Sequence, residues 1–297
     1  MSAHAAPRGV LVGVDGSSSA KVAVDWAARE AVFRDVALTV VAVCPPPAML
    51  LMPEMPMPGE FLAHQERRCR EYLDDARKVA EEAMSDGRAV DIRTEMPTGP
   101  IVPVLVEMTK DAELVVAGSR GLGAVSRVLL GSVSSGLLRH AHCPVAVIHD
   151  EDPLMAGPPA TAPVVVGIDG SPASELATAI AFDAASRRGV ELVAVHAISD
   201  SDLMELPRSD YSALESQANE ILAERLAGWG ERYPDVAVRR VVEWARPAAC
   251  LVKHSESAQL LVVGSHGRGG FAGMVLGSVG FSVAQAVRMP VIVARAR

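Results

Sequence analysis

Two groups of glycines with the same spacing carry the strongest chemical signal in this 297-residue sequence. Each group follows the pattern G-x2-G-x9-G-S and begins at the end of a short apolar run. Glycine lets the backbone take positive φ and approach a ligand closely, and the exposed N–H groups can then bind an anion. We expect the serine to cap a helix whose free N–H groups and dipole favour phosphate. The residues are Gly118, Gly121, Gly131 and Ser132, and again Gly264, Gly267, Gly277 and Ser278.

For one such group, glycines that merely form turns are the simpler alternative. The repetition of the whole pattern favours a phosphate cradle instead. The aspartates of VGVDGS and VGIDGS, Asp15 and Asp169, are candidates to face the same ligand. Each could also cap the following helix, as could Ser17 and Ser171. Asp200 follows a later apolar run and is a weaker candidate for a contact with the ligand or a metal, because surface acids are common.

These motifs recur because the chain is an internal duplication. The segment VLVGVDGS reappears as VVVGIDGS 154 residues later. Residues 111–149 match residues 257–295 without gaps at 14 of 39 positions, at an offset of 146. The Pro- and Met-rich stretch 45–58, which the second copy lacks, accounts for the difference between the offsets.

Each copy alternates short apolar runs with longer amphipathic segments, and the region between the copies is rich in Pro, Gly and acidic residues. We predict a domain over 1–150, a linker over 151–162 and a domain over 163–297. The expected strands are 9–14, 38–43, 90–94, 114–118 and 144–149, then 164–168, 192–197, 236–242, 260–264 and 291–294. The expected helices are 17–34, 65–84, 102–109 and 132–140, then 173–188, 213–232, 247–257 and 278–288.

Continuous apolar strands separated by helices indicate a parallel sheet that is covered on both faces. The fold class is therefore α/β, with two tandem doubly wound five-stranded parallel-sheet domains of Rossmann-like type. Ligands of such sheets bind outside the carboxyl ends of the strands, where the strand order reverses. The glycine and aspartate motifs both fall at such strand ends.

The charge balance argues against a nucleic-acid partner. The chain has 28 basic and 36 acidic residues, a net charge of −8, and each half carries −4. The four cysteines form no C-x-x-C pair, so we expect neither a disulfide framework nor a thiolate zinc site, and a reducing cytosol fits best. No signal peptide or membrane-spanning apolar run is recognised, so we expect a cytoplasmic protein without membrane insertion.

Several catalytic and metal motifs are missing from the sequence. No G-x-x-x-x-G-K-[ST] is present, so no P-loop lysine supports fast phosphoryl transfer. The order of glycines in residues 118–123 is not that of a dinucleotide fingerprint, and no S-G-G-x-D-S loop occurs. Residues 139–143 (RHAHC) and the methionines of 45–58 could bind a metal, but a helix end and an apolar contact surface are the simpler interpretations. We predict no metal site.

The V-G-V/I-D-G-S segment and the glycine pattern together resemble the universal stress protein family, and tandem members of its ATP-binding branch in particular. The resemblance implies an adenine nucleotide alpha-hydrolase-like fold and two ATP sites per chain, with or without Mg²⁺. Asp15 and Asp169 would lie near the adenosine, Val41 and the residue after it would line the adenine, and the glycines would hold ribose and phosphates. The full set of candidate ligand contacts is Gly13, Asp15, Val41, Gly118, Ser119, Arg120, Gly121, Leu122, Gly123, Gly131, Ser132 and Val133, then Gly167, Asp169, Asp200, Gly264, Ser265, His266, Gly267, Arg268, Gly269, Gly277, Ser278 and Val279.

The predicted function is that of an ATP-binding regulator of stress or growth state, not a fast enzyme. A slow Mg-dependent ATPase or phosphotransferase and a nucleotide-free dimeric interaction module are the alternatives. The final apolar strand of each copy lies at a sheet edge in the family, and an exposed apolar edge needs a partner. We therefore expect the two halves to form a pseudo-dimer and the chains to form a homodimer.

Overall fold

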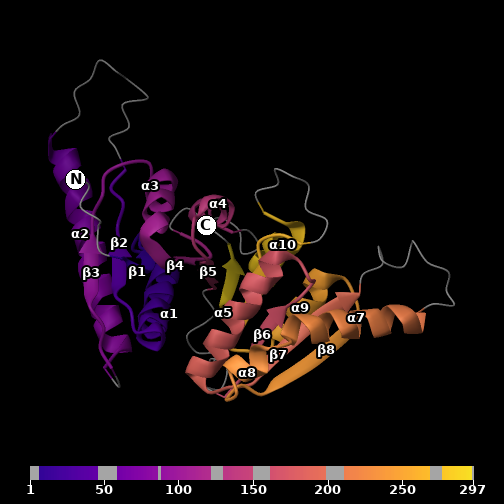
Figure 1. The fold of residues 1–297 in the computed structure, drawn as a ribbon. Helices are drawn as coiled ribbons and strands as arrows, with labels where there is room; N and C mark the ends of the chain where they lie inside the picture. Colours follow the sequence, from indigo (N-terminus) through magenta and orange to yellow (C-terminus); the bar gives the residue numbers. More distant parts are fainter. Residues whose placement is uncertain are drawn as a thin grey trace, which may run out of the picture. The chain divides into compact units, whose positions relative to one another are not determined.

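The computed structural model describes residues 7–45, 59–85, 88–121, 130–149, 161–198, 211–267 and 276–295. The chain divides into two compact units, residues 1–150 and 151–296, with residue 297 grouped with the first. Each unit is an α/β domain, and its strands pair in parallel, as the sequence predicts. Figure 1 shows the elements of both units.

The first unit has the sheet order β3-β2-β1-β4-β5. The order in which the chain adds strands reverses between β1 and β4, and these two strands are parallel. The helices α1 and α2 pack together on one face, and α3 and α4 pack together on the other. The elements are β1 (Gly9–Gly13), α1 (Ser18–Arg34), β2 (Leu38–Val41), α2 (Gly59–Ala83), β3 (Ile92–Glu95), α3 (Ile101–Met108), the 3₁₀ turn η1 (Thr109–Asp111), β4 (Ala112–Gly118), α4 (Ser132–His140) and β5 (Val145–Ile148).

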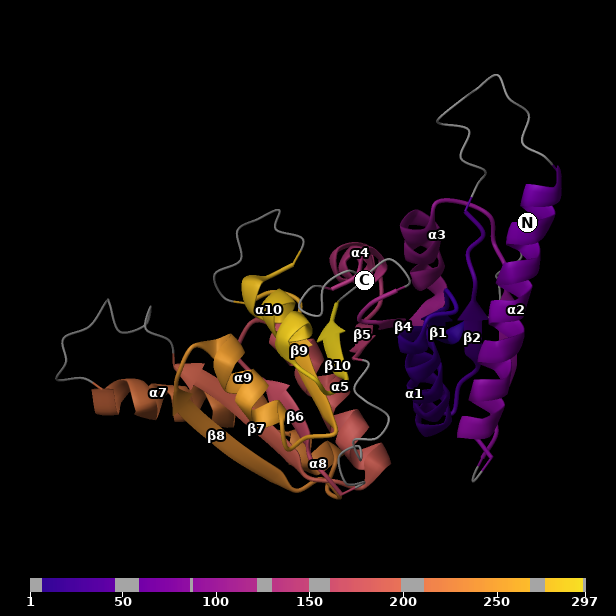
Figure 2. The ribbon, with the colours of Figure 1, turned by 180° about the vertical axis from the view of Figure 1, so that it is seen from behind.

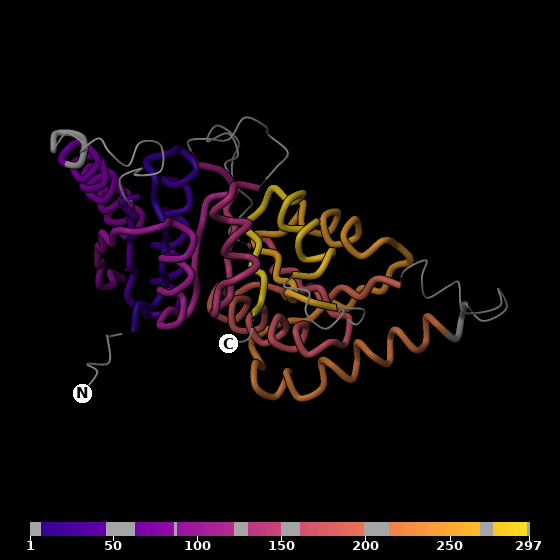
Figure 3. Tube along the Cα trace, turned by 90° about the horizontal axis from the view of Figure 1, so that it is seen from above, coloured from indigo at the N-terminus to yellow at the C-terminus, as the bar shows by residue number. Residues whose placement is uncertain are grey.

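The second unit repeats this arrangement with the order β8-β7-β6-β9-β10, whose strands lie side by side in Figure 2. Figure 3 shows α5 and α7 on one side of these strands and α9 and α10 on the other. The elements are β6 (Val164–Gly167), α5 (Pro172–Arg188), β7 (Leu192–Ile198), α7 (Tyr211–Leu226), α8 (Trp229–Arg232), β8 (Val238–Trp244), α9 (Pro247–Ser255), β9 (Leu260–Gly264), α10 (Ser278–Ala286) and β10 (Val291–Ala294).

The central strands are apolar along their whole length because helices cover both of their faces. In β1 and β4, Val10, Leu11, Leu114 and Val115 have no exposed surface. Burying each such side chain stabilises the fold by about 1.5–3 kcal/mol. The strands therefore form a rigid support, and the polar residues that follow their carboxyl ends are held in fixed positions.

Two helices differ substantially from the sequence prediction, whereas the bounds of the others lie within two residues of it. Helix α2 begins at Gly59, six residues before the expected start at residue 65. The segment expected as one helix over 213–232 is divided into α7 and α8, because Gly228 adopts φ +78° and interrupts the helix. Positive φ is compatible with glycine but not with a continuous α-helix. Within the described residues, no helix is long and apolar enough to cross a membrane.

Candidate functional site

The two chemical motifs of the first unit meet where the strand order reverses. Asp15 follows β1, and Gly118 is the last residue of the neighbouring strand β4. A Cβ atom placed on Gly121 would lie 2.5 Å from Oδ2 of Asp15. The loop after β4 therefore passes directly against the carboxylate, and only a residue without a side chain fits there without moving it.

The two oxygens of the Asp15 carboxylate have different neighbours. Oδ1 accepts hydrogen bonds from the backbone N–H of Ser17 at 3.0 Å and from its hydroxyl at 2.6 Å. The Ser17 hydroxyl in turn accepts from the N–H of Ala20 and caps α1. Oδ2 is the oxygen beside Gly121. Asp15 thus supports the start of the helix with one oxygen and reaches the glycine loop with the other.

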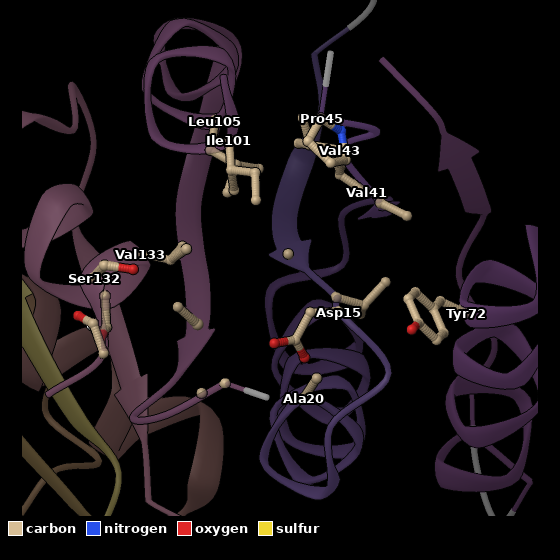
Figure 4. Close-up of a pocket in the computed structure, with 18 of the residues that line it drawn as sticks. Asp15, Ala20, Val41, Val43, Pro45, Tyr72, Ile101, Leu105, Ser132 and Val133 are labelled. Atoms are coloured by element: carbon tan, nitrogen blue, oxygen red, sulfur yellow. Dashed lines mark hydrogen bonds between the residues drawn. The ribbon is translucent and has the colours of Figure 1, made fainter. Parts of the chain in front are cut away.

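A cavity of about 730 Å³ opens at these strand ends. Figure 4 shows Asp15 beside it, Tyr72 pointing in from α2, Ile101 and Leu105 from α3, and Val133 from α4. Nine of the twelve candidate residues of the first unit line the cavity: Gly13, Asp15, Val41, Gly118, Arg120, Gly121, Gly131, Ser132 and Val133. Ser119 is buried and is not among the lining residues. Leu122 and Gly123 lie outside the described residues.

The glycine cradle differs in two respects from the sequence prediction. First, the N-cap of α4 is Gly131, and Ser132 is the first residue of the helix. Gly131 donates its N–H to the carbonyl of Ser119 at 2.8 Å and offers no side chain to cap the helix. The first-turn N–H groups of a helix have no partner within the helix, and those of α4 receive no side-chain cap. Ser132 and Val133, the first two residues of α4, line the cavity.

Second, positive φ does not explain why these positions are occupied by glycine. Gly118, Gly121 and Gly131 all have φ outside the left-handed region. Close packing explains the first two, since a Cβ on Gly118 would lie 2.6 Å from Oγ of Ser19. At Gly131 the nearest atoms would be 3.5 Å away, so an alanine would fit there.

Helix α2 forms a wall of the cavity that none of the sequence motifs indicates. Gln65, Arg68, Cys69 and Tyr72 lie on one face of α2 and line the cavity. Gly16 has φ +82°, and a Cβ there would lie 2.2 Å from the Tyr72 ring. The spacing of three and four residues on an amphipathic helix is the sequence signal for such a face, but it does not say which cavity the face meets.

Cys69 is a neutral thiol in this wall. Burial, together with a hydrogen bond involving Cys44, raises the pKa of the Cys69 thiol to about 12. A thiol with so high a pKa carries very little thiolate at neutral pH. The cavity wall that Cys69 contributes is therefore apolar and uncharged.

Comparison with known proteins gives the family. The model of the universal stress protein family matches residues 7–149 and 161–295. The chain belongs to the universal stress protein family. Universal stress protein Rv2623 of Mycobacterium tuberculosis is 56% identical over 296 residues, which cover 99% of each chain.

A solved universal stress protein has the same fold. The crystal structure of one from Archaeoglobus fulgidus superposes with a TM-score of 0.70 at 21% identity, covering 97% of this chain and 98% of that one. Another universal stress protein, crystallised in complex with cAMP, is 27% identical over 50% of this chain and 100% of its own, with a TM-score of 0.38.

The second unit of this universal stress protein repeats the local geometry of the first. The N–H of Ser171 donates to Oδ1 of Asp169 at 2.9 Å, and a Cβ on Gly267 would lie 2.7 Å from Oδ2. Gly277 donates to the carbonyl of Ser265 at 2.7 Å and is the N-cap of α10, so Ser278 is again the first helical residue. The predicted N-cap role is therefore wrong for both serines.

The remaining candidates of the second unit lie around this geometry. The hydroxyl of Ser265, a buried residue, is 3.0 Å from Nδ1 of His266. The carbonyl of His266 accepts from the hydroxyl of Ser171. Gly167 ends β6, and Val279 is the second residue of α10. Asp200, Arg268 and Gly269 lie outside the described residues.

The two units differ at a further position that lines the cavity of the first unit. The strand registers place His196 where the first unit has Ala42, a cavity-lining residue. His196 is buried, and its Nδ1 is 2.6 Å from the carbonyl oxygen of Ile168. The second unit therefore offers an imidazole where the first offers a methyl group.

Proposed function

We propose that the cavity of the first unit binds ATP. The observation that carries this proposal is the position of the cavity, at the carboxyl ends of β1 and β4 with both sequence motifs in its wall. Its volume of about 730 Å³ is within the range of about 300–1,000 Å³ that is usual for small-molecule sites. Doubly wound sheets bind their ligands at this switch point.

The two ends of the cavity suit the two ends of a nucleotide. Val41, Val43, Ile101 and Leu105 make one side apolar, as a purine base requires. The backbone at Gly118 and Gly121 and the start of α4 supply N–H groups for phosphate oxygens. Arg120 also lines the cavity and supplies a cation. We assign Asp15 to the ribose, whose hydroxyls can donate to its Oδ2.

The second unit supports a second nucleotide site with a different base contact. Asp169 and Gly267 repeat the close approach of Asp15 and Gly121. In our proposal His196 lies at the base end of this site, so the two sites have unequal affinities. A protein with two such sites and no P-loop lysine in its sequence is suited to sense ATP as a regulator of stress or growth state, and not to hydrolyse it rapidly.

The direct test is nucleotide binding by variants at one glycine. In Gly121→Ala the new Cβ displaces Oδ2 of Asp15, so titration calorimetry with ATP should show the loss of the first site. Gly230→Ala is the matched control, because Gly230 has no positive φ and its Cβ would meet no atom within 4 Å. Equal effects of the two substitutions, or no ATP binding by the unmodified protein, would contradict the proposal.

Hydrolysis is tested separately. Tag-free protein is mixed with sub-stoichiometric Mg-ATP, and ADP is followed by chromatography after acid quenching. Our proposal expects ATP to be recovered intact over many minutes. ADP that forms within a single turnover, and that Gly121→Ala abolishes, would instead support the slow Mg-dependent ATPase or phosphotransferase.

A further inference from the structure

Three side chains of metal-ligand type meet in the second unit. Glu243 is near the end of β8, and Cys250 and His254 are four residues apart on one face of α9. The ligand atoms of these three side chains all lie within 4.8 Å of one another. Among the described residues, no other three His, Cys, Asp or Glu side chains are grouped so closely. Residues four apart on a helix present their side chains on the same face, so the strand and the helix supply the ligands jointly.

The distances are close to those of a coordination shell. Oε1 of Glu243 is 3.0 Å from Nε2 of His254, and Oε2 is 3.8 Å from Sγ of Cys250. In a tetrahedral zinc site, bonds of 2.0–2.3 Å place nitrogen, oxygen and sulfur ligands about 3.3–3.6 Å apart. Small side-chain rotations are therefore enough to arrange these three atoms around one ion.

The burial of the group suits an ion that enters from one side. Cys250 is buried, whereas the side chains of His254 and Glu243 are 17% and 30% exposed. The carboxylate is ionised, because the hydrogen bonds from Lys253 and His254 lower the pKa of Glu243. Burial and the neighbouring carboxylate raise the pKa of Cys250 to about 11, so its thiol is neutral while no cation is bound.

The ammonium of Lys253 already balances part of the negative charge of the Glu243 carboxylate. Its Nζ is 3.3 and 3.2 Å from the two oxygens of Glu243, and its side chain is 67% exposed. An exposed ammonium on a flexible stem contributes little to stability and can move into solvent. A divalent ion would take its place beside the carboxylate.

The first unit provides an internal comparison. The strand registers and the repeat place Pro97, Val104 and Met108 at the positions of Glu243, Cys250 and His254. The common scaffold therefore does not require a polar group at these positions. All three changes toward ligand-type side chains occur together in the second unit.

We propose that Glu243, Cys250 and His254 form a zinc site that joins β8 to α9. A donor set of one sulfur, one nitrogen and one oxygen suits Zn²⁺ and not Mg²⁺ or Ca²⁺, which take oxygen ligands. On binding, the S–H bond of Cys250 breaks, its proton passes to solvent, and the thiolate lone pair forms the S–Zn bond. The proton that Nε2 of His254 shares with Glu243 also leaves Nε2, and the imidazole carries its proton on Nδ1, so that the Nε2 lone pair forms the N–Zn bond. The zinc stays divalent, and water completes the tetrahedron. Because β8 is the outermost strand of its unit, the ion would hold it to the helix layer.

The test is zinc binding by full-length, reduced, tag-free protein, measured by competition with a chromogenic chelator. We expect one zinc per chain. Cys250→Ser and His254→Ala should each weaken it by more than about 100-fold, since even changes outside the ligand shell cost 10–100-fold. Cys143→Ser and His140→Ala are the matched controls in the first unit and should bind zinc as the unmodified protein does. Lys253→Ala should bind as well or better, because it removes the competing ammonium.

Cobalt provides a second readout that identifies the sulfur ligand. Co²⁺ in place of zinc should give a near-ultraviolet thiolate-to-metal absorption band, which Cys250→Ser should remove. Circular dichroism checks that each variant folds, and if Cys250→Ser does not fold, His254→Ala and Glu243→Gln carry the test. Zinc binding that survives all three ligand substitutions, or no zinc bound by the folded unmodified protein, would overturn the proposal.

Discussion

At the residue scale, the site depends on how closely a carboxylate and the glycines approach each other and the start of a helix. Asp15 uses Oδ1 to hold the turn before α1, while its Oδ2 faces Gly121. Gly131 begins α4 with extended backbone and no side chain, so the helix end carries no cap of its own. The same absence of a side chain leaves the first-turn N–H groups of α4 available for an anion.

Replacement of Gly131 should therefore change stability and binding in opposite directions. In Gly131→Asp the carboxylate can cap α4, because the extended N-cap backbone suits aspartate and the nearest atoms are 3.5 Å from the new Cβ. We expect the free energy of unfolding to rise by roughly 0.5 kcal/mol and ATP binding to the first site to be lost. Urea unfolding and calorimetry measure the two effects. Gly131→Ala should keep the binding, and an equal loss in both variants would refute the role of charge.

The raised pKa of the Cys69 thiol should lower the free energy of unfolding at alkaline pH. Its folded pKa is raised to about 12, whereas the unfolded thiol ionises near 9. The neutral thiol therefore favours the folded state below pH 9, and this contribution is lost as the pH rises toward 12. Between pH 8 and 10.5, the urea-unfolding free energy of the unmodified protein should decrease more steeply than that of Cys69→Ala. Parallel curves would show that the thiol does not carry the effect.

At the element scale, helix ends and ion pairs decide how firmly the walls are held. Ser17 caps α1 and Asp35 ends it in the left-handed region, while Ser171 caps α5 and Gly189 ends that helix. Within α1, Glu30 is 2% exposed and pairs with Arg34 at 2.7 Å. Removing one partner of a buried ion pair leaves the other charge without compensation, which costs far more than loss of an exposed pair.

The Arg34 side chain should consequently be important for stability. Arg34→Ala is expected to lower the free energy of unfolding by about 3 kcal/mol, because it removes the 2.7 Å ion pair of a carboxylate that is 2% exposed. Arg29→Ala removes a pair of the same spacing in the same helix, but its members are 57% and 43% exposed. That control should change stability by less than about 1 kcal/mol. Similar chemical-denaturation midpoints for the two variants would contradict the argument.

At the scale of the whole molecule, duplication produces two units with the same scaffold and different walls. The contact between aspartate and glycine occurs in both, whereas the imidazole of His196 and the cluster of Glu243, Cys250 and His254 belong to the second. The first unit has Ala42 and three residues without a carboxylate, thiol or imidazole group at the corresponding positions. The copies can therefore have different ligand preferences while each keeps its sheet.

If both units bind ATP, a single substitution in one unit should abolish ATP binding to that unit alone. Gly121→Ala and Gly267→Ala each push a Cβ against an aspartate oxygen, at 2.5 and 2.7 Å. Calorimetry should give two ATP per chain for the unmodified protein, one for each single variant and none for the double variant. A single variant that loses both sites would show that the sites are not independent.

The sequence determined the α/β class and the parallel strands, and it placed the glycine and aspartate motifs at the strand ends where the cavity lies. Apolar periodicity shows which segments are buried, and in a doubly wound sheet the residues after the strands gather at one edge. The start of α2 and the break at Gly228 were missed, because helix boundaries depend on local capping and tertiary contacts that periodicity does not record. The expectation of positive φ at the motif glycines was wrong because packing against Ser19 and Asp15 sets that requirement.

Only the tertiary structure decided which distant side chains share a space. Tyr72 and Cys69 reach the cavity because α2 packs beside α1 and β2, an arrangement set by contacts far apart in the sequence. Glu243 meets Cys250 and His254 because the turn after β8 folds α9 back beside the strand end. Local patterns in the chain specify helices, strands and turns, but the chemistry of a cavity wall depends on the packing that brings separate elements together.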